Sequence, residues 1–302
     1  MINNIKIIGM LSLIISLFGC VKDGVDECPE CPEAHVKINF FAEKFRNKYQ
    51  DPLMEREEKF CDRVSHLRYY LYKDGELYSQ GMIDSFSDPH SPGFLMEYSG
   101  LKYGNYTVVA VANCSGESLS GDPTKMNQLL LTYPGCETTE DYFTAVFPFT
   151  VDAPTSDEYN VGLLRAHGVI RYTFENMPSD ISDIEIRMEN VYGKKWIAGN
   201  YEEGTKVSRR YKMNTTGVKQ SVEDYVIGTF PSIAGEKSAY YLNLYREGEI
   251  TPYISQLISD TLTVTRNQLL EIAVKFNDGN LDFEIDLDSD WDGSHSDVET
   301  EL

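Results

Sequence analysis

The sequence predicts an all-β protein built as two antiparallel β-sandwich domains in tandem. Short strand patterns recur in two blocks, turn residues separate the strands, and no helical period lasts beyond a few turns. The composition agrees, since 20 Tyr, 14 Phe, 22 Gly and 12 Pro suit strands joined by tight turns. A length of 302 residues allows about two domains.

The first block of strands begins with the segment from Val36 to Phe41, where apolar and polar residues alternate as in a half-buried strand. A second strand follows at 67–72, and Asp74-Gly75 after it is a two-residue hairpin signal. The β-branched run at 107–112 predicts a buried strand, and 142–151 closes the block.

The second block repeats this pattern after a polar segment containing Pro154, which marks a domain boundary. Its strands are expected at 169–174, 184–188, 225–230, 240–245, 262–264 and 269–274. The predicted organisation is a signal peptide (1–19), an acidic tether (20–34), an N-terminal sandwich (35–154), a C-terminal sandwich (155–292) and an acidic tail (293–302).

The charge balance excludes one class of partner. Asp and Glu number 48 against 27 Lys and Arg, which gives a formal net charge of −21. A field of this sign repels phosphate backbones, so nucleic acid is not expected as a partner.

The first twenty residues indicate an exported protein. An apolar run from Ile7 to Phe18 has the length of a signal peptide and is too short for a stable membrane span. It ends in Leu17-Phe18-Gly19-Cys20, which resembles a bacterial lipobox, so Cys20 is the expected lipidation site and the new N-terminus. Acyl chains such as palmitate on Cys20 would tether the mature protein to a membrane. The alternative is a secretory signal with an incidental cysteine.

Six cysteines raise the question of disulfides. If Cys20 carries lipid, five remain, and an odd number leaves at least one outside a pair. Cys114 and Cys136 bracket a turn-rich loop and are candidates for a disulfide in an oxidising compartment. The pairing of Cys28, Cys31 and Cys61 is left open.

The C-terminal segment contains the sharpest local motif. The segment around Gly293 matches the calcium-loop pattern D-x-D-x-D-G-x₅-E, with Asp288, Asp290, Asp292 and Glu299 at the acidic positions. The same aspartates also fit one solvated face of an extended strand, and residues on one face of a strand cannot surround an ion. The strand is the preferred interpretation, so calcium is a minor candidate and no cofactor is expected.

Catalytic motifs are not found in the sequence. It has no H-E-x-x-H, P-loop, G-x-S-x-G or G-x-G-x-x-G pattern, and its five histidines are scattered. We therefore expect a protein that is not an enzyme.

Several segments together resemble one family across nearly the whole chain. These are the lipobox at Cys20, Cys31-Pro32, the strand at 67–75, the segment from Leu101 to Asn113, the segment from Leu163 to Ile170, and an alternating strand that ends at Trp291. Their order and spacing resemble the FimB-like fimbrial anchor and accessory-subunit lipoproteins of type V pili in Bacteroidetes.

This resemblance implies two transthyretin-like sandwiches and a lipid anchor that holds the protein, surface-exposed, at the cell outer membrane. It implies a structural role as anchor or minor subunit of the pilus, joined to pilin subunits by β-strand exchange. Stalk subunits of the wider superfamily lose their first strand by proteolysis after a basic residue, which makes Arg46 and Arg56 candidate cleavage sites, whereas an anchor keeps that strand. The alternative function is a lipid-anchored surface module that binds a glycan or a host protein, for which an aromatic platform on a sheet would be evidence.

Overall fold

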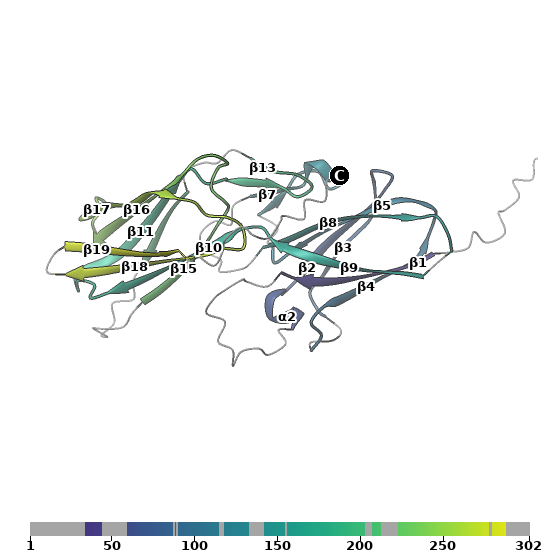
Figure 1. Ribbon diagram of the computed structural model, residues 1–302, viewed down its shortest axis with the longest axis horizontal. Helices are drawn as coiled ribbons and strands as arrows, with labels where there is room; N and C mark the ends of the chain where they lie inside the picture. Colours follow the sequence, from purple (N-terminus) through teal and green to yellow (C-terminus); the bar gives the residue numbers. More distant parts are fainter. Residues whose placement is uncertain are drawn as a thin grey trace, which may run out of the picture.

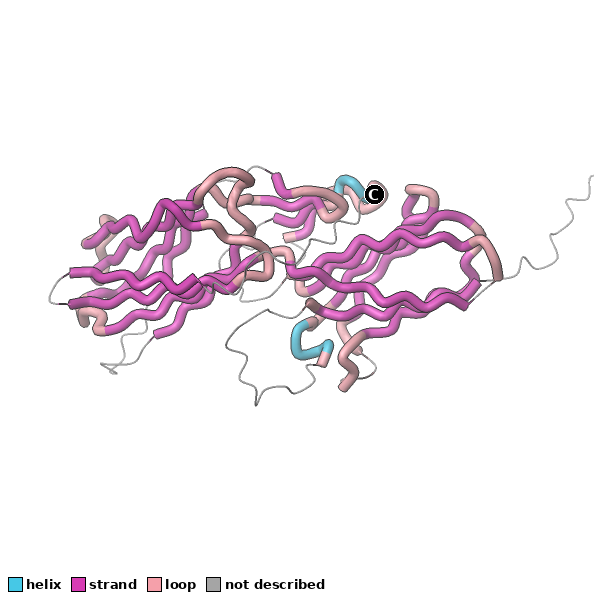
Figure 2. The backbone as a smooth tube through the Cα atoms, in the orientation of Figure 1, coloured by secondary structure: helices cyan, strands magenta, loops and turns pink. Residues whose placement is uncertain are grey.

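The computed structural model describes residues 34–43, 59–86, 88, 90–114, 118–132, 142–154, 156–202, 207–212, 223–277 and 280–287. These residues form two layered β bodies that lie end to end along the long axis of the molecule (Figures 1 and 2). The helical elements of the described residues are short, namely α2 (Phe60–Arg63) and η2 (Met126–Gln128). The predicted all-β class is confirmed.

The first body is a seven-stranded sheet with the order β3-β2-β5-β8-β9-β1-β4. Its strands are β1 (Ala34–Ala42), β2 (Leu67–Lys73), β3 (Glu76–Ile83), β4 (Phe94–Leu101), β5 (Gly104–Ala112), β8 (Phe143–Val151) and β9 (Ser156–Arg165). Strands β8 and β9 pair only at Phe143↔Arg165 and Thr144↔Leu164. Beyond these two pairs they diverge, so the sheet folds into two layers, β3-β2-β5-β8 and β9-β1-β4.

The core of this body lies between the two layers. Strand β1 contributes Val36, Ile38 and Phe40, and all three are at most 1% exposed. Fully burying such side chains stabilises a fold by about 1.5–3 kcal/mol each. The predicted hairpin is present between β2 and β3, where Asp74 (φ 50°) and Gly75 (φ 87°) have the two positive φ angles of a type I′ turn.

The second body is a sandwich of two four-stranded sheets, with the orders β15-β10-β18-β19 and β14-β11-β16-β17. Its strands are β10 (Gly168–Glu175), β11 (Ile181–Glu189), β14 (Val207–Lys212), β15 (Glu223–Thr229), β16 (Ser238–Arg246), β17 (Ile254–Leu262), β18 (Leu269–Asn277) and β19 (Asn280–Leu287). Each of the four central strands places an apolar residue that is at most 1% exposed in one cluster. These residues are Ile170, Ile186, Leu242 and Ile272.

Two strand pairs differ from the antiparallel pattern that the sequence predicts. β1 runs parallel to β9, and β10 runs parallel to β18, so these sheets are mixed. Apolar alternation shows which face of a strand is buried, but it does not show which strand lies beside it. The relative direction of paired strands could therefore not be derived from the sequence. The boundary near residue 154 stays a prediction, although β9, which follows it directly, joins the first body through β1.

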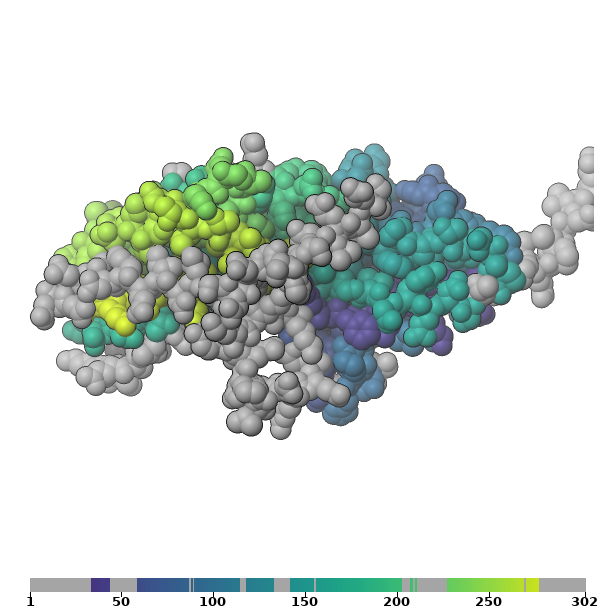
Figure 3. All heavy atoms as spheres, viewed as in Figure 1, coloured from purple at the N-terminus to yellow at the C-terminus, as the bar shows by residue number. Residues whose placement is uncertain are grey.

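A small third sheet connects the two bodies. Its order is β13-β12-β7-β6, with β6 (Leu119–Ser120) and β7 (Leu130–Thr132) from the first half of the chain and β12 (Lys194–Trp196) and β13 (Tyr201–Glu202) from the second. Strands β7 and β12 pair directly across the two halves. The space-filling view shows the two bodies in contact at this junction (Figure 3).

The junction is also hydrophobic. Val109 and Val111 on the outer face of β5 belong, with Leu131 of β7, to the same buried cluster as the core of the second body. β5 is therefore buried on both faces, since Val108 and Ala110 point into the first core. The two bodies therefore share this cluster, while the core between the layers of the first body is a separate cluster, and they are not independent units on a linker.

We predict that Leu131→Ala destabilises the whole protein, because Leu131 is 0% exposed at this shared core. The expected loss in the free energy of unfolding is about 2–4 kcal/mol, measured by chemical denaturation. The matched control is Leu257→Ala in β17, where the side chain is 40% exposed and we expect a loss below about 0.5 kcal/mol. Equal effects at the two positions would contradict the shared core.

Candidate functional site

The structure describes few of the residues that the sequence marks as sites. Most of these residues lie outside the described part of the chain, namely Cys20, Arg46, Arg56, Cys136 and the calcium pattern Asp288, Asp290, Asp292 and Glu299. Cys114 is described and is buried at the end of β5, while Cys61 lies half-buried in α2. Within the described residues, no group of three His, Cys, Asp or Glu side chains is placed to hold a metal ion.

The feature that stands out is the position of β1, the first described strand of the chain. It lies between β9 and β4 in its layer, and we call this position the β1 slot. On one side β1 pairs with β9 from His35↔Ser156 to Ala42↔Leu163, and on the other with β4 from Ala34↔Leu101 to Phe40↔Phe94. A strand in such a slot makes backbone hydrogen bonds on both edges, and its alternate side chains fill apolar pockets.

Glu43, the residue directly after β1, binds the junction between the two bodies. Its main-chain N–H donates to the carbonyl of Leu163 (2.9 Å), which continues the ladder with β9. Its carboxylate accepts hydrogen bonds from Nη1 of Arg266 at both oxygens (2.9 and 2.8 Å) and from the main-chain N–H of Arg165 (2.8 Å). Nη1 of Arg63 donates to the carbonyl oxygen of Glu43.

Further cationic side chains lie in this junction although the chain as a whole is acidic. The Arg165 side chain is buried, lies over the Phe143 ring (5.0 Å to the centroid) and donates through Nε to Oδ1 of Asn267 (3.1 Å). Lys195 of β12 lies close enough to Arg266 for the two charges to repel. Burial first, and Arg266 second, lower the pKa of the Lys195 ammonium to about 8.

Hydrogen bonds hold this junction rigidly. Nζ of Lys195 donates to the carbonyls of Gly199 (3.1 Å) and Trp196 (3.3 Å), and it lies 5.2 Å from the centroid of the Tyr201 ring. The Tyr201 hydroxyl donates to the carbonyl of Ala166 (2.6 Å), and burial raises the pKa of this phenol. The main-chain N–H of Asn267 donates to the carbonyl of His167 (2.8 Å), so the segments around 166 and 267 are joined directly.

His167 lies in the same junction with both ring nitrogens engaged. Nε2 accepts a hydrogen bond from the main-chain N–H of Tyr142 (3.1 Å), and Nδ1 lies 3.0 Å from the carbonyl of Gly168. These contacts fit the neutral tautomer that carries its proton on Nδ1. His167 therefore has a packing role here.

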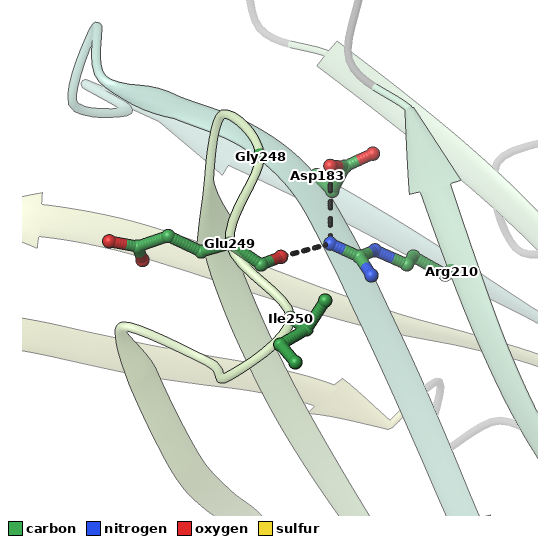
Figure 4. A pocket seen from close by; sticks show the side chains of 5 residues that line it. All are labelled: Asp183, Arg210, Gly248, Glu249 and Ile250. Carbon is green, nitrogen blue, oxygen red and sulfur yellow. Dashed lines mark hydrogen bonds and ion pairs between the residues drawn. The ribbon is translucent and has the colours of Figure 1, made fainter.

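A shallow hollow lies at the opposite end of the second body, between β14 and the β16–β17 loop (Figure 4). Nη2 of Arg210 binds Oδ2 of Asp183 (3.3 Å) and the carbonyl of Glu249 (3.0 Å), while Ile250 projects into solvent and is 90% exposed. The hollow is thus bridged by an ion pair of the protein itself, and its lining residues do not form an arrangement with an evident chemical function.

The outer face of the sheet that contains Arg210 does not offer an open aromatic platform. The guanidinium of Arg187 covers the ring of Tyr241 (4.1 Å to the centroid), and that of Arg210 covers the ring of Tyr245 (3.9 Å). The Glu185 carboxylate accepts hydrogen bonds from Ser208 (2.6 Å), Tyr245 (2.5 Å) and Asn243 (2.9 Å). Burial opposes its ionisation, but these bonds outweigh it and lower the pKa of Glu185.

The comparison with protein families gives one match. The family described as "Mfa2: Fimbrillin-A associated anchor proteins Mfa1 and Mfa2" matches residues 27–297. Among curated proteins no significant sequence match is found. No helix in the described part of the chain is long and apolar enough to cross a membrane.

Solved structures with a similar fold come from related bacteria. A Bacteroides thetaiotaomicron protein, provisionally described as polysaccharide binding, is 13% identical with a TM-score of 0.58 and covers 84% of this chain and 96% of its own. A Bacteroides ovatus protein, provisionally described as an adhesin, is 14% identical with a TM-score of 0.56 and coverages of 85% and 94%. The fimbrial anchor protein Mfa2 from Porphyromonas gingivalis is 13% identical with a TM-score of 0.51 and coverages of 84% and 97%. Identities this low show a shared fold alone.

The pKa of Lys195 leads to a prediction about stability and pH. Because the pKa is about 8 in the fold and ordinarily 10.5, the cost of burying the ammonium is complete below pH 8 and declines as the pH rises toward 10.5. We predict that wild type gains about 1–2 kcal/mol relative to Lys195→Met between pH 7 and pH 9.5, measured by denaturant unfolding. The matched control is Lys194→Met, which removes the neighbouring lysine of the same strand, whose side chain is exposed. A constant difference for Lys195→Met would contradict the burial of a charged Lys195.

Proposed function

The chain belongs to the family of fimbrillin-A associated anchor proteins Mfa1 and Mfa2, and from this premise we propose that it is a structural subunit of a fimbria. In this proposal a lipid on Cys20 anchors it to the outer membrane, surface-exposed, and it joins a pilin by β-strand exchange. The observation that carries the proposal is the central, doubly paired position of β1 next to the predicted tether.

The proposed role as an anchor requires that β1 stays in its slot. If the chain is not cut at Arg46 or Arg56, β1 connects the lipid-bearing tether to the fold through its pairs with β9 and β4. A filled slot cannot accept a strand from another subunit, so growth of the fimbria would end at this chain. In this proposal the open slot belongs to the pilin. A strand of the anchor would enter the slot of the pilin and restore both of its hydrogen-bond ladders.

The geometry of Glu43 supports retention of β1. A charge-assisted hydrogen bond is about twice as strong as a neutral one, and the carboxylate of Glu43 makes such bonds to Arg266. Removing β1 together with Glu43 would leave Arg266 and Lys195 close together without this carboxylate.

The alternative function, a surface module for a glycan or a host protein, has less support. An aromatic platform would favour it, but Tyr241 and Tyr245 lie under arginine side chains on the sheet described above. Tyr253, which is 49% exposed, is covered by Arg246 at 3.4 Å from the ring centroid.

We predict that Cys20→Ser moves the protein from the membrane fraction to the soluble fraction of its native cells, because the acyl chains supply the attachment. Fractionation followed by mass spectrometry of the N-terminal peptide measures this. The control Cys61→Ser, within the fold, should leave the protein in the membrane fraction. Membrane attachment that survives Cys20→Ser would contradict the lipid anchor.

A second prediction concerns which slot the partner strand enters. Lys37 of β1 and Glu97 of β4 are direct cross-strand neighbours, so Lys37→Cys with Glu97→Cys would lock β1 in its slot when oxidised. We expect the locked chain to capture a pilin that lacks its first strand as well as wild type does, and neither chain to capture the intact pilin. The reduced form of the double variant is the control. If the locked chain fails to capture the pilin, the β1 slot itself is the acceptor and the chain is a stalk subunit.

A further inference from the structure

The β1 slot has a charged end as well as apolar pockets. Along β1 the inward side chains are Ala34, Val36, Ile38 and Phe40, each at most 1% exposed, followed by the partly buried Ala42. The next residue is Glu43, whose carboxylate meets the main-chain N–H of Arg165 and the guanidinium of Arg266. We call these two groups the anion subsite. It binds the strand where the apolar pattern ends.

The anion subsite is built from both bodies of the protein. Arg165 ends β9 in the first body, and Arg266 lies in the turn before β18 in the second, 223 residues from Glu43 in sequence. The Glu43 side chain is 16% exposed and that of Arg266 is 39% exposed, so the pair is partly withdrawn from water. Coulombic attraction and hydrogen bonds are stronger in such a place than at an open surface.

A second ion pair on β1 provides the contrast. Nζ of Lys37 lies 3.2 Å from Oε1 of Glu97 on the outer face, with side chains 40% and 58% exposed. Exposed ion pairs of this kind contribute little to stability. The charges of Lys37 in β1 and of Glu43 directly after it therefore differ in their surroundings. Of the two, Glu43 meets a main-chain donor together with a counter-ion from the other body.

We infer that the anion subsite makes the β1 slot selective for a strand that carries a carboxylate directly after its inward apolar residues. The ligand class is an extended peptide with apolar residues at alternate positions, closed by an acidic residue. A strand with a neutral residue at this point would leave Arg266, which lies close to Lys195, without its counter-charge. An apolar residue would in addition leave the Arg165 N–H without the acceptor that Glu43 provides. This inference rests on the proposed retention of β1 in its slot, since it concerns which strand the slot holds.

The test is a refolding competition with the whole chain. A protease site engineered between residues 46 and 56 allows the folded protein to be nicked, after which every residue is still present. The nicked protein is unfolded in denaturant and then refolded with an excess of two isotopically distinct peptides of residues 34–46, one native and one with Glu43→Gln. Mass spectrometry of the purified complex gives the ratio of the two bound peptides.

We expect the native peptide to be retained over the Glu43→Gln peptide by at least about tenfold, as for a charge-assisted hydrogen bond in a partly buried place. The matched control is a Lys37→Gln peptide, which also changes one charge of β1 and should be retained within about threefold of the native peptide. Equal retention of the native and Glu43→Gln peptides would overturn the inference while leaving strand exchange intact. If no peptide is retained, the slot does not hold a separate strand, and this overturns the inference. The proposed exchange, in which a strand of this chain enters the slot of a pilin, is then still tested by the locked variant described above.

A double-mutant cycle in the intact chain gives a second measurement that does not depend on exchange. Glu43→Gln, Arg266→Gln and the double variant are compared by chemical denaturation. We expect the double variant to be clearly more stable than the sum of the single effects predicts. Additive effects would mean that Glu43 and Arg266 are not coupled and would also overturn the inference.

Discussion

The pairing of β1 with both β9 and β4 is the contact on which the first body depends. Without β1, β4 would lose its neighbour in the sheet, and β9 would keep only its two residue pairs with β8. The layer β9-β1-β4 would then cease to exist as a sheet, and the opposite layer would lose the apolar cover that Val36, Ile38 and Phe40 supply. The strand β1 lies inside its layer, paired on both edges, so its retention decides whether the first core is closed.

The second dependency is between the two bodies. They share an apolar cluster through the outer face of β5 and the sheet formed by β7 and β12. Electrostatics also favours cohesion of the two bodies. A chain with a net charge of −21 repels itself, whereas the junction brings together the cationic residues Arg165, Lys195 and Arg266. Glu43 gives this cationic cluster a counter-charge that is itself part of the β1 segment. Seating of β1 and cohesion of the junction therefore support each other.

The sequence predicted the features that depend on neighbouring residues. Alternation located β1, and Asp74-Gly75 located the β2–β3 hairpin, because both patterns are local consequences of strand and turn geometry. β17 was missed except for Leu262, because its Ser and Gln side chains on an exposed edge carry little apolar periodicity. The parallel pairing of β1 with β9 and the contact of Glu43 with Arg266 join residues more than 100 positions apart, and no local signal encodes such distances. The sequence therefore did not mark Glu43 as a site residue.

In the proposed role as an anchor, the direction of β1 determines how the fold carries load. A lipid-bearing tether pulls on β1 from the side of Ala34, and β1 runs from that end of the first body toward the junction (Figure 1). The pull acts along the strand, so the backbone pairs with β9 and β4 resist it together in shear and are not opened one after another. Glu43 lies at the far end of the strand, bound to Arg266 of the second body. Sliding β1 out of its slot would require the ladders and this ion pair to break in one step, which is the mechanical property that a membrane anchor needs.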